Sequence, residues 1–183
     1  MMTANLAMNA VWIPMWCAEY RWPALGIIWA MLGTSTSVWL DVGAPSGPAP
    51  SMTEWLSVRP FTSLYTSWLA VACTVATAST LATRERPHQT LLGASPSTWA
   101  KLVLPAAALI TSGLGVMHSD ATVPAVGAWA LFAIATKQRD DSRYPGDASV
   151  ASLARTLAWG CTVASAGILA LTVSRGDQWW LSA

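Results

Sequence analysis

The sequence predicts an all-α fold, a polytopic integral membrane bundle of five to six transmembrane helices. Of its 183 residues, 54% are hydrophobic and only 10% are charged, and the mean hydropathy is +0.43. Several stretches of about 18 residues or more carry no charge, which is the length that crosses a hydrocarbon core. Twelve residues are tryptophan, a side chain that membranes hold at their interfaces. We therefore treat residues 1–183 as a single transmembrane domain.

The first apolar segment, residues 5–18, is short and contains Asn5, Asn9 and Pro14. We leave open whether it crosses the bilayer or lies in the interface. The first basic residue of the chain is Arg21. Because a secretory signal needs a basic region before its apolar stretch, we assign residues 1–18 to the mature protein.

The next two segments, residues 23–40 and 61–82, are long enough to cross the membrane at about 1.5 Å per residue. Residues 41–58 lie between them and are rich in Gly, Pro and Ser. This composition predicts an exposed, structureless loop.

Three more segments follow, at residues 101–117, 122–136 and 150–173. The middle one is short, and only residues 118–121 separate it from its predecessor. We expect these two segments to form a helical hairpin. Alanine and glycine are frequent in all of these spans, which favours close helix packing in lipid.

The placement of basic residues supports this helix count. If every segment from residue 23 onward spans, eight Lys or Arg residues lie on one side and two on the other, as the positive-inside rule requires. The eight are Arg21, Arg84, Arg86, Lys101, Lys137, Arg139, Arg143 and Arg155, and the two are Arg59 and Arg175. We predict a bacterial inner-membrane or organelle-membrane protein whose C-terminus lies on the non-cytoplasmic side.

Several classes of function are disfavoured. No basic stripe suggests nucleic acid binding. The two histidines, His88 and His118, fall on opposite sides of the predicted topology, so they share no metal. A single tetrapyrrole-metal ligand at His118 is less favoured than a solvated histidine at a helix end. None of the nine acidic residues lies near the middle of a span, which disfavours transport. We find no acid–base pair and predict that the protein is not an enzyme.

The three cysteines, Cys17, Cys73 and Cys161, are far apart in apolar segments. We interpret them as free thiols that pack as small hydrophobic groups.

The tryptophans fall into two groups. Seven lie near span ends or in loops, where an aromatic belt explains them. These are Trp22, Trp39, Trp55, Trp99, Trp159, Trp179 and Trp180. The other five, Trp12, Trp16, Trp29, Trp68 and Trp129, are placed where no interfacial anchor is needed.

The spacing of Asn9, Trp12 and Trp16 puts all three on one helix face. Such rings either pack helices together or line an apolar cavity for a planar hydrophobic ligand.

Three motifs resemble those of a known family. Residues 9–16, NAVWIPMW, are similar to the N-x-x-W-x-x-x-aromatic helix of the tryptophan-rich sensory protein family, the TspO/MBR group that includes the translocator protein. Residues 59–72, RPFTSLYTSWLAVA, resemble the P-F-S-L-Y-x-x-W-x-x-V-A helix start of its more distant, longer branch. Residues 128–131, AWAL, with a following basic turn and a final Ala-rich helix, also resemble that branch.

The chain departs from the family pattern in two respects. Members of that branch usually have a further helix before the N-x-x-W helix, and the Pro-rich first loop and Trp-Pro-Pro-type motif of the core family are not visible in this sequence. The resemblance implies binding of a tetrapyrrole or another flat lipophilic molecule, with no cofactor required. The candidate ligand-binding residues are Asn9, Trp12, Trp16, Tyr65, Trp68 and Trp129. The rings would provide stacking faces, and Asn9 and Tyr65 hydrogen bonds.

The alternative function is a structural accessory subunit of a larger photosynthetic or respiratory membrane complex. The expected partners are the lipid bilayer, a hydrophobic small molecule, and other membrane subunits or a second copy of the chain.

Overall fold

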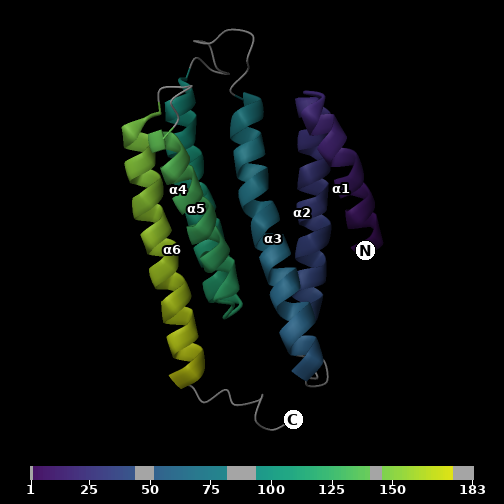
Figure 1. Ribbon diagram of the computed structural model, residues 1–183. Coiled ribbons are helices and arrows are strands. Elements are labelled where there is room, and N and C mark those ends of the chain that lie inside the picture. Colours follow the sequence, from purple (N-terminus) through teal and green to yellow (C-terminus); the bar gives the residue numbers. More distant parts are fainter. Residues whose placement is uncertain (1, 44–51, 82–93, 141–145, 175–183) are drawn as a thin grey trace.

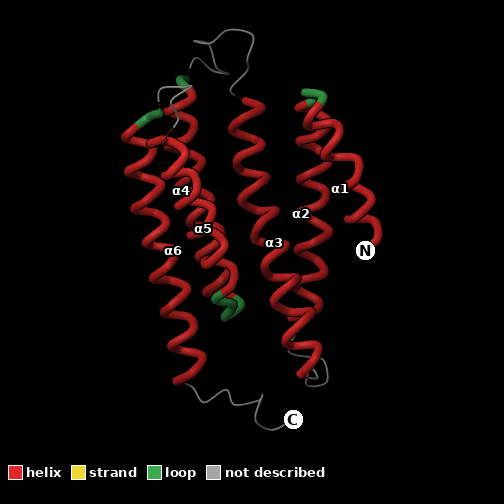
Figure 2. The backbone as a smooth tube through the Cα atoms, in the orientation of Figure 1, coloured by secondary structure: helices red, strands yellow, loops and turns green. Residues whose placement is uncertain are grey.

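The structure is a computed structural model that describes residues 2–43, 52–81, 94–140 and 146–174. All regular structure in these ranges is α-helical (Figure 2), so the predicted fold class is confirmed. The helices are α1 Met2–Cys17, α2 Arg21–Gly43, α3 Met52–Leu81, α4 Pro96–Met117, α5 Thr122–Asp140 and α6 Ala148–Ser174.

The helices lie side by side, and α2 to α6 alternate in direction (Figure 1). Four are long and apolar enough to cross a membrane: α2 over Arg21–Val42, α3 over Pro60–Leu81, α4, and α6. Helix α1 has 16 residues, about 24 Å at the rise of an α-helix, which is less than a hydrocarbon core. Helix α5 has 19 residues and carries Lys137 and Arg139 in its last turn.

Helix α3 begins at Met52, nine residues before the predicted span. The prediction of a loop over residues 41–58 is therefore wrong at both ends, since residues 41–43 belong to α2 and residues 52–58 to α3. The reason is local composition: residues 52–58 contain neither Gly nor Pro, and α3 continues through Pro60. The Pro-rich part of the predicted loop, residues 44–51, lies outside the described residues.

Two separate hydrophobic cores divide the molecule into two groups of three helices. The first core joins α2 and α3, and partly buried side chains of α1 pack on it; its buried residues are Ile28, Met31, Leu69, Cys73 and Ala76. The second joins α4, α5 and α6 around residues that include Leu131, Ala154 and Cys161. Helix α3 also packs on α4 and α5 and so links the groups (Figure 1).

Glycine permits the close crossing of α4 and α5. A Cβ atom on Gly115 would lie 2.5 Å from Cδ of Pro124 and 3.0 Å from the carbonyl oxygen of Asp120. A Cβ atom on Gly127 would lie 2.6 Å from Oγ1 of Thr111. Small residues at such crossings let helix backbones approach in lipid.

Asp147 caps α6 and ties it to its neighbours. Its Oδ1 accepts hydrogen bonds from the backbone N–H of Ser149 at 2.8 Å and of Val150 at 3.2 Å, as at a helix N-cap. Its Oδ2 accepts a hydrogen bond from Ser97 of α4. The hydrogen bonds from Ser149 and Ser97 hold the pKa of the Asp147 carboxyl well below its usual range.

The alternating helix directions bring four described basic residues of the predicted cytoplasmic group to one end of the molecule (Figure 1), whereas the fifth, Arg155, lies about two turns inside α6. Arg21 begins α2, Lys101 lies in the second turn of α4, and Lys137 and Arg139 end α5. Arg84, Arg86, Arg143 and Arg175 lie outside the described residues. The orientation of the chain across the bilayer stays a prediction.

Candidate functional site

The six predicted site residues lie in two places rather than around one central cavity. The first is the packing of α1 against α2 and α3. The rings of Trp12 and Trp16 stack with their centroids 5.9 Å apart, and both pack against the first core. The guanidinium of Arg21 lies 5.4 Å from the Trp16 ring centroid, at a distance typical of a cation–π contact.

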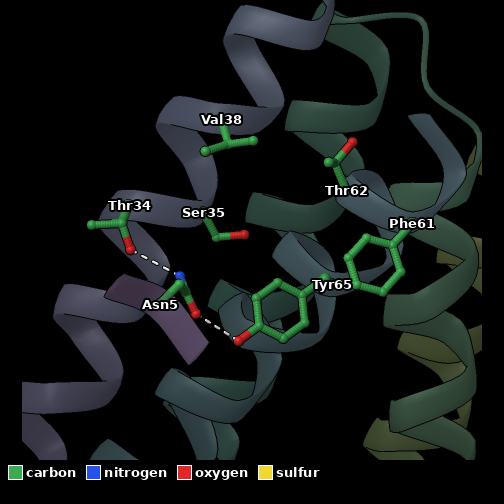
Figure 3. A pocket seen from close by; sticks show the side chains of 7 residues that line it. All are labelled: Asn5, Thr34, Ser35, Val38, Phe61, Thr62 and Tyr65. Carbon is green, nitrogen blue, oxygen red and sulfur yellow. Dashed lines mark hydrogen bonds between the residues drawn. The ribbon is translucent and has the colours of Figure 1, made fainter. Parts of the chain in front are cut away.

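The polar residue that joins α1 to its neighbours is Asn5 rather than Asn9. The Asn5 side-chain amide donates to the carbonyl of Met31 at 2.9 Å and to Oγ1 of Thr34 at 2.8 Å. Its side-chain oxygen accepts from the Tyr65 hydroxyl at 2.6 Å. Figure 3 shows this side-chain network between α1, α2 and α3. Asn9 lies one turn further along α1 and is partly exposed.

The second place is an aromatic pair on the outer surface of α3 and α5. The ring centroids of Trp68 and Trp129 are 5.7 Å apart, and the two residues are 44% and 62% exposed. Trp68 belongs to an exposed apolar stripe on α3 with Phe61, Leu64 and Val75, whose spacing places them on one helix face.

The pair extends onto α6 through a second aromatic contact. The Phe132 ring meets the Trp159 ring edge to face at a centroid distance of 5.4 Å. We call Trp68, Trp129, Phe132 and Trp159 the aromatic band. Within the described part of the chain, no acceptor binds the indole N–H of Trp68, Trp129 or Trp159.

Trp39 is not the interfacial anchor that its sequence position predicted. It is 5% exposed, and its indole N–H donates to Oγ of Ser63 and to Oδ2 of Asp120, both at 3.2 Å. Ser63 also donates to Oδ2 of Asp120 at 2.5 Å. This network joins α2 and α3 to the turn between α4 and α5. His118 of that turn packs edge to face on Trp39 at 4.7 Å.

Two cavities that described residues line are small. A cavity of about 20 Å³ lies beside Asn5 and Tyr65, and one of about 80 Å³ lies between α2, α3, α4 and α5, where Trp39, Thr66 and Leu114 contribute to its lining. Pockets for drug-sized ligands are about 300–1,000 Å³. Neither of these two cavities, both lined by described residues, holds a tetrapyrrole as it stands.

The described residues contain no group of three His, Cys, Asp or Glu side chains that would hold a metal ion. His88, Trp179 and Trp180 lie outside these residues. Cys73 and Cys161 are buried free thiols, whereas Cys17 is exposed at the end of α1.

A comparison with protein families identifies the family to which the chain belongs. The sequence model of the TSPO-like protein family matches residues 1–174, which is nearly the whole chain and every described helix. The chain belongs to the TSPO-like protein family. Neither a curated protein nor a solved structure matches it. The TSPO-like chain is thus a polytopic helical membrane protein, as the sequence motifs indicated.

Sequence reasoning missed two polar centres of this TSPO-like protein, Asn5 and the Trp39–Asp120 contact. A signal for Asn5 was present, because residues 5, 12 and 16 also share one face of a helix. No local signal connects Trp39 with Asp120, which are 81 residues apart in the chain.

Proposed function

We propose that this TSPO-like membrane protein binds a planar hydrophobic molecule, such as a tetrapyrrole, on the aromatic band. The observation that carries the proposal is the contact between the exposed rings of Trp68 and Trp129. The proposed role is binding without catalysis, and the ligand reaches the site from the bilayer.

The position of the band argues against simple anchoring. Tryptophan prefers the membrane interface, yet Trp68 lies in the middle of the apolar stretch Pro60–Leu81 and Trp159 lies eleven residues into α6. Lipid tails offer no acceptor for an indole N–H. A flat ligand with polar substituents supplies both a stacking partner and hydrogen-bond acceptors.

The other predicted residues support this surface from the side. Tyr65 lies one turn before Trp68 on the same face of α3, and its hydroxyl is held by Asn5 of α1. Trp12 and Trp16 pack α1 against the first core. We therefore assign stacking to Trp68 and Trp129, and positioning of α1 and α3 to Tyr65, Trp12 and Trp16. Asn9, partly exposed on α1, lies in the other of the two places and takes no part in the proposed binding on the aromatic band.

The test is a titration of the purified protein with protoporphyrin, followed by quenching of tryptophan fluorescence. Stacking of aromatic rings contributes about 0.5–1.5 kcal/mol, so Trp68→Ala or Trp129→Ala should weaken binding by roughly two- to tenfold. Trp29→Ala is the matched control, because Trp29 is similarly exposed (48%) but its indole N–H donates to Thr77 of α3. Linear quenching, or equal effects of all three substitutions, would contradict the proposal.

A second candidate function is that of an accessory subunit in a larger membrane complex. The aromatic band supports this accessory function as well as it supports ligand binding, because another subunit or its pigments would also cover the exposed rings. Blue-native electrophoresis of the native membrane separates the two functions. Migration only as a monomer or a dimer would contradict the accessory role and leave ligand binding in place.

A further inference from the structure

The cavity of about 80 Å³ beside Trp39 is elongated along the helices. Its lining residues on α2 are Leu32, Thr36 and Trp39, whose spacing places them on one face of the helix. Leu32 and Trp39 are separated by about 10 Å along the helix axis. Ile110 and Leu114, one turn apart, line the cavity from α4. The cavity is therefore a groove with α2 and α4 as its walls, and we call it the α2–α4 groove.

The α2–α4 groove is closed by α3 and open on the opposite side. On its floor, Ser67 and Ala70 of α3 are 2% and 8% exposed. At its rim, Ile110 is 48% exposed, and Thr36 and Leu114 are partly exposed. Helix α3 packs against both α2 and α4, whereas the described residues of α2 and α4 do not pack extensively on each other. The mouth of the groove therefore lies between α2 and α4.

The mouth is continuous with the surface that the spans present to lipid. Both walls lie in stretches that are apolar enough to cross a membrane, Arg21–Val42 and Pro96–Met117. From the end of the first stretch, Trp39 lies about 4.5 Å and Leu32 about 15 Å along the helix. Since a hydrocarbon core is about 30 Å thick, the groove reaches from near one surface of the core to its middle. It therefore has the depth of one leaflet.

The polar groups of the groove do not provide a site for water. A buried water needs two to four polar partners. The hydroxyl groups of Thr66 and Ser67 already form hydrogen bonds with other residues of α2 and α3, and the indole N–H of Trp39 has two acceptors. Thr36 is the one polar side chain of the lining that makes no side-chain hydrogen bond within the described residues. One free hydroxyl group does not hold a water molecule.

The size of the groove suits a hydrocarbon chain. A water molecule takes about 30 Å³ and a methylene group is of similar size, so a volume of about 80 Å³ holds about three such groups in a row. Ligands with ring systems need pockets of about 300–1,000 Å³. The groove is also separate from the aromatic band, because Trp68 lies on the other side of α3 from Thr66 and Ala70.

We propose that the α2–α4 groove holds the middle section of one acyl chain of a bilayer phospholipid, from the leaflet on the side of the α4–α5 turn. The chain runs along the helices and supplies contacts that the walls and floor lack without it. A phospholipid is the source because the mouth opens to the bilayer, whose chains surround the spans. Since α2 and α3 belong to the first core and α4 to the second, the chain packs against both groups of helices.

The experiment uses the natural protein in phosphatidylcholine vesicles with a small fraction of a photoactivatable phosphatidylcholine, which carries a diazirine midway along one acyl chain. After irradiation, mass spectrometry locates the lipid adducts residue by residue. We expect adducts on Ser67 or Ala70, which lipid outside the groove does not contact. Adducts on Leu109, which is 73% exposed on α4, report the surrounding lipid in the same sample.

Three variants test the position of the chain. Ala70→Leu should abolish the adducts on Ser67, because the larger side chain fills the groove, and should keep those on Leu109. Leu114→Ala should increase the adducts on the floor, because it widens the groove, and opposite effects of two substitutions exclude a mere loss of folding. Ala166→Leu is the matched control, since it adds the same side chain at an exposed position of α6, outside the groove, and should change neither adduct.

Labelling of Leu109 without labelling of Ser67 or Ala70 would overturn the proposal, as would floor adducts that persist in Ala70→Leu. A free fatty acid with the same diazirine, at the same mole fraction, should label the floor no more strongly than the phospholipid does. A clear preference for the free acid would exclude the phospholipid as the occupant. Protoporphyrin should leave the floor adducts unchanged, and their loss on its addition would assign the groove to the planar ligand instead.

Discussion

Replacement of Gly115 by alanine should destabilise the α4–α5 hairpin, although alanine is the better helix former. A Cβ atom at this position would lie 2.5 Å from Cδ and 3.1 Å from Cγ of Pro124. Carbon atoms pack at about 3.5–4.0 Å, so the proline ring, which has no flexible end, would have to move by about 1 Å. Overpacking of this kind costs about 1–3 kcal/mol.

Gly113→Ala is the matched control, because a Cβ atom on Gly113 would meet nothing within 4 Å. Both substitutions gain the same helix propensity, up to about 1 kcal/mol, so their difference isolates the contact with Pro124. For a chain of this size, 1–3 kcal/mol corresponds to roughly 2–12 °C in the midpoint of thermal unfolding.

The assay is thermal unfolding in one detergent, followed by the monodispersity of the protein on gel filtration. We expect Gly115→Ala to unfold at a lower temperature than Gly113→Ala. Equal midpoints would refute the reasoning and show that the crossing of α4 and α5 has room for a methyl group.

Three further predictions concern polar contacts between helices. Asn5→Ala should loosen the packing of α1 more than Tyr65→Phe does, because Asn5→Ala removes three hydrogen bonds and Tyr65→Phe removes one. Each bond contributes about 0.5–1.5 kcal/mol, and the protease sensitivity of the N-terminal segment measures the loosening. Trp39→Phe should lower the free energy of unfolding by about 1.5–3 kcal/mol, the range for a hydrogen bond to a charged acceptor, here Asp120; a titration with sodium dodecyl sulfate checks the value. The pKa of Asp147 is lower in the folded protein than the ordinary value of about 3.9 in an unfolded chain. The stability it contributes is therefore present above about pH 4 and is lost as the pH falls toward the folded-state pKa. The difference in unfolding midpoint between the natural protein and Asp147→Asn should stay constant from pH 7 to pH 5 and shrink below pH 4.

The helices were predictable because hydropathy over about 20 residues reports burial in lipid directly. Helix α6 illustrates this, since the predicted span of residues 150–173 lies within two residues of the observed helix, Ala148–Ser174, at both ends. The start of α3 was missed because the segment after Ser51 is amphiphilic and carries Glu54 and Arg59, so hydropathy alone did not join it to the span.

The arrangement of side chains around each helix was less predictable. Hydropathy does not distinguish a side chain that faces lipid from one that faces another helix, because both surroundings are apolar. Trp68 and Trp129 were expected to line a cavity, yet they are exposed. Trp39 was expected at the interface, yet it is buried and hydrogen-bonded. Contacts that join distant parts of the chain decided both positions.

The division into two cores has a consequence for synthesis. Every residue of the first core precedes Leu81, so a ribosome that has delivered α3 to the membrane has delivered a complete packing unit. The second core uses only α4, α5 and α6 and is incomplete until the last helix emerges. Assembly can therefore proceed in two stages, in which the finished N-terminal half offers α3 as a surface for the later half.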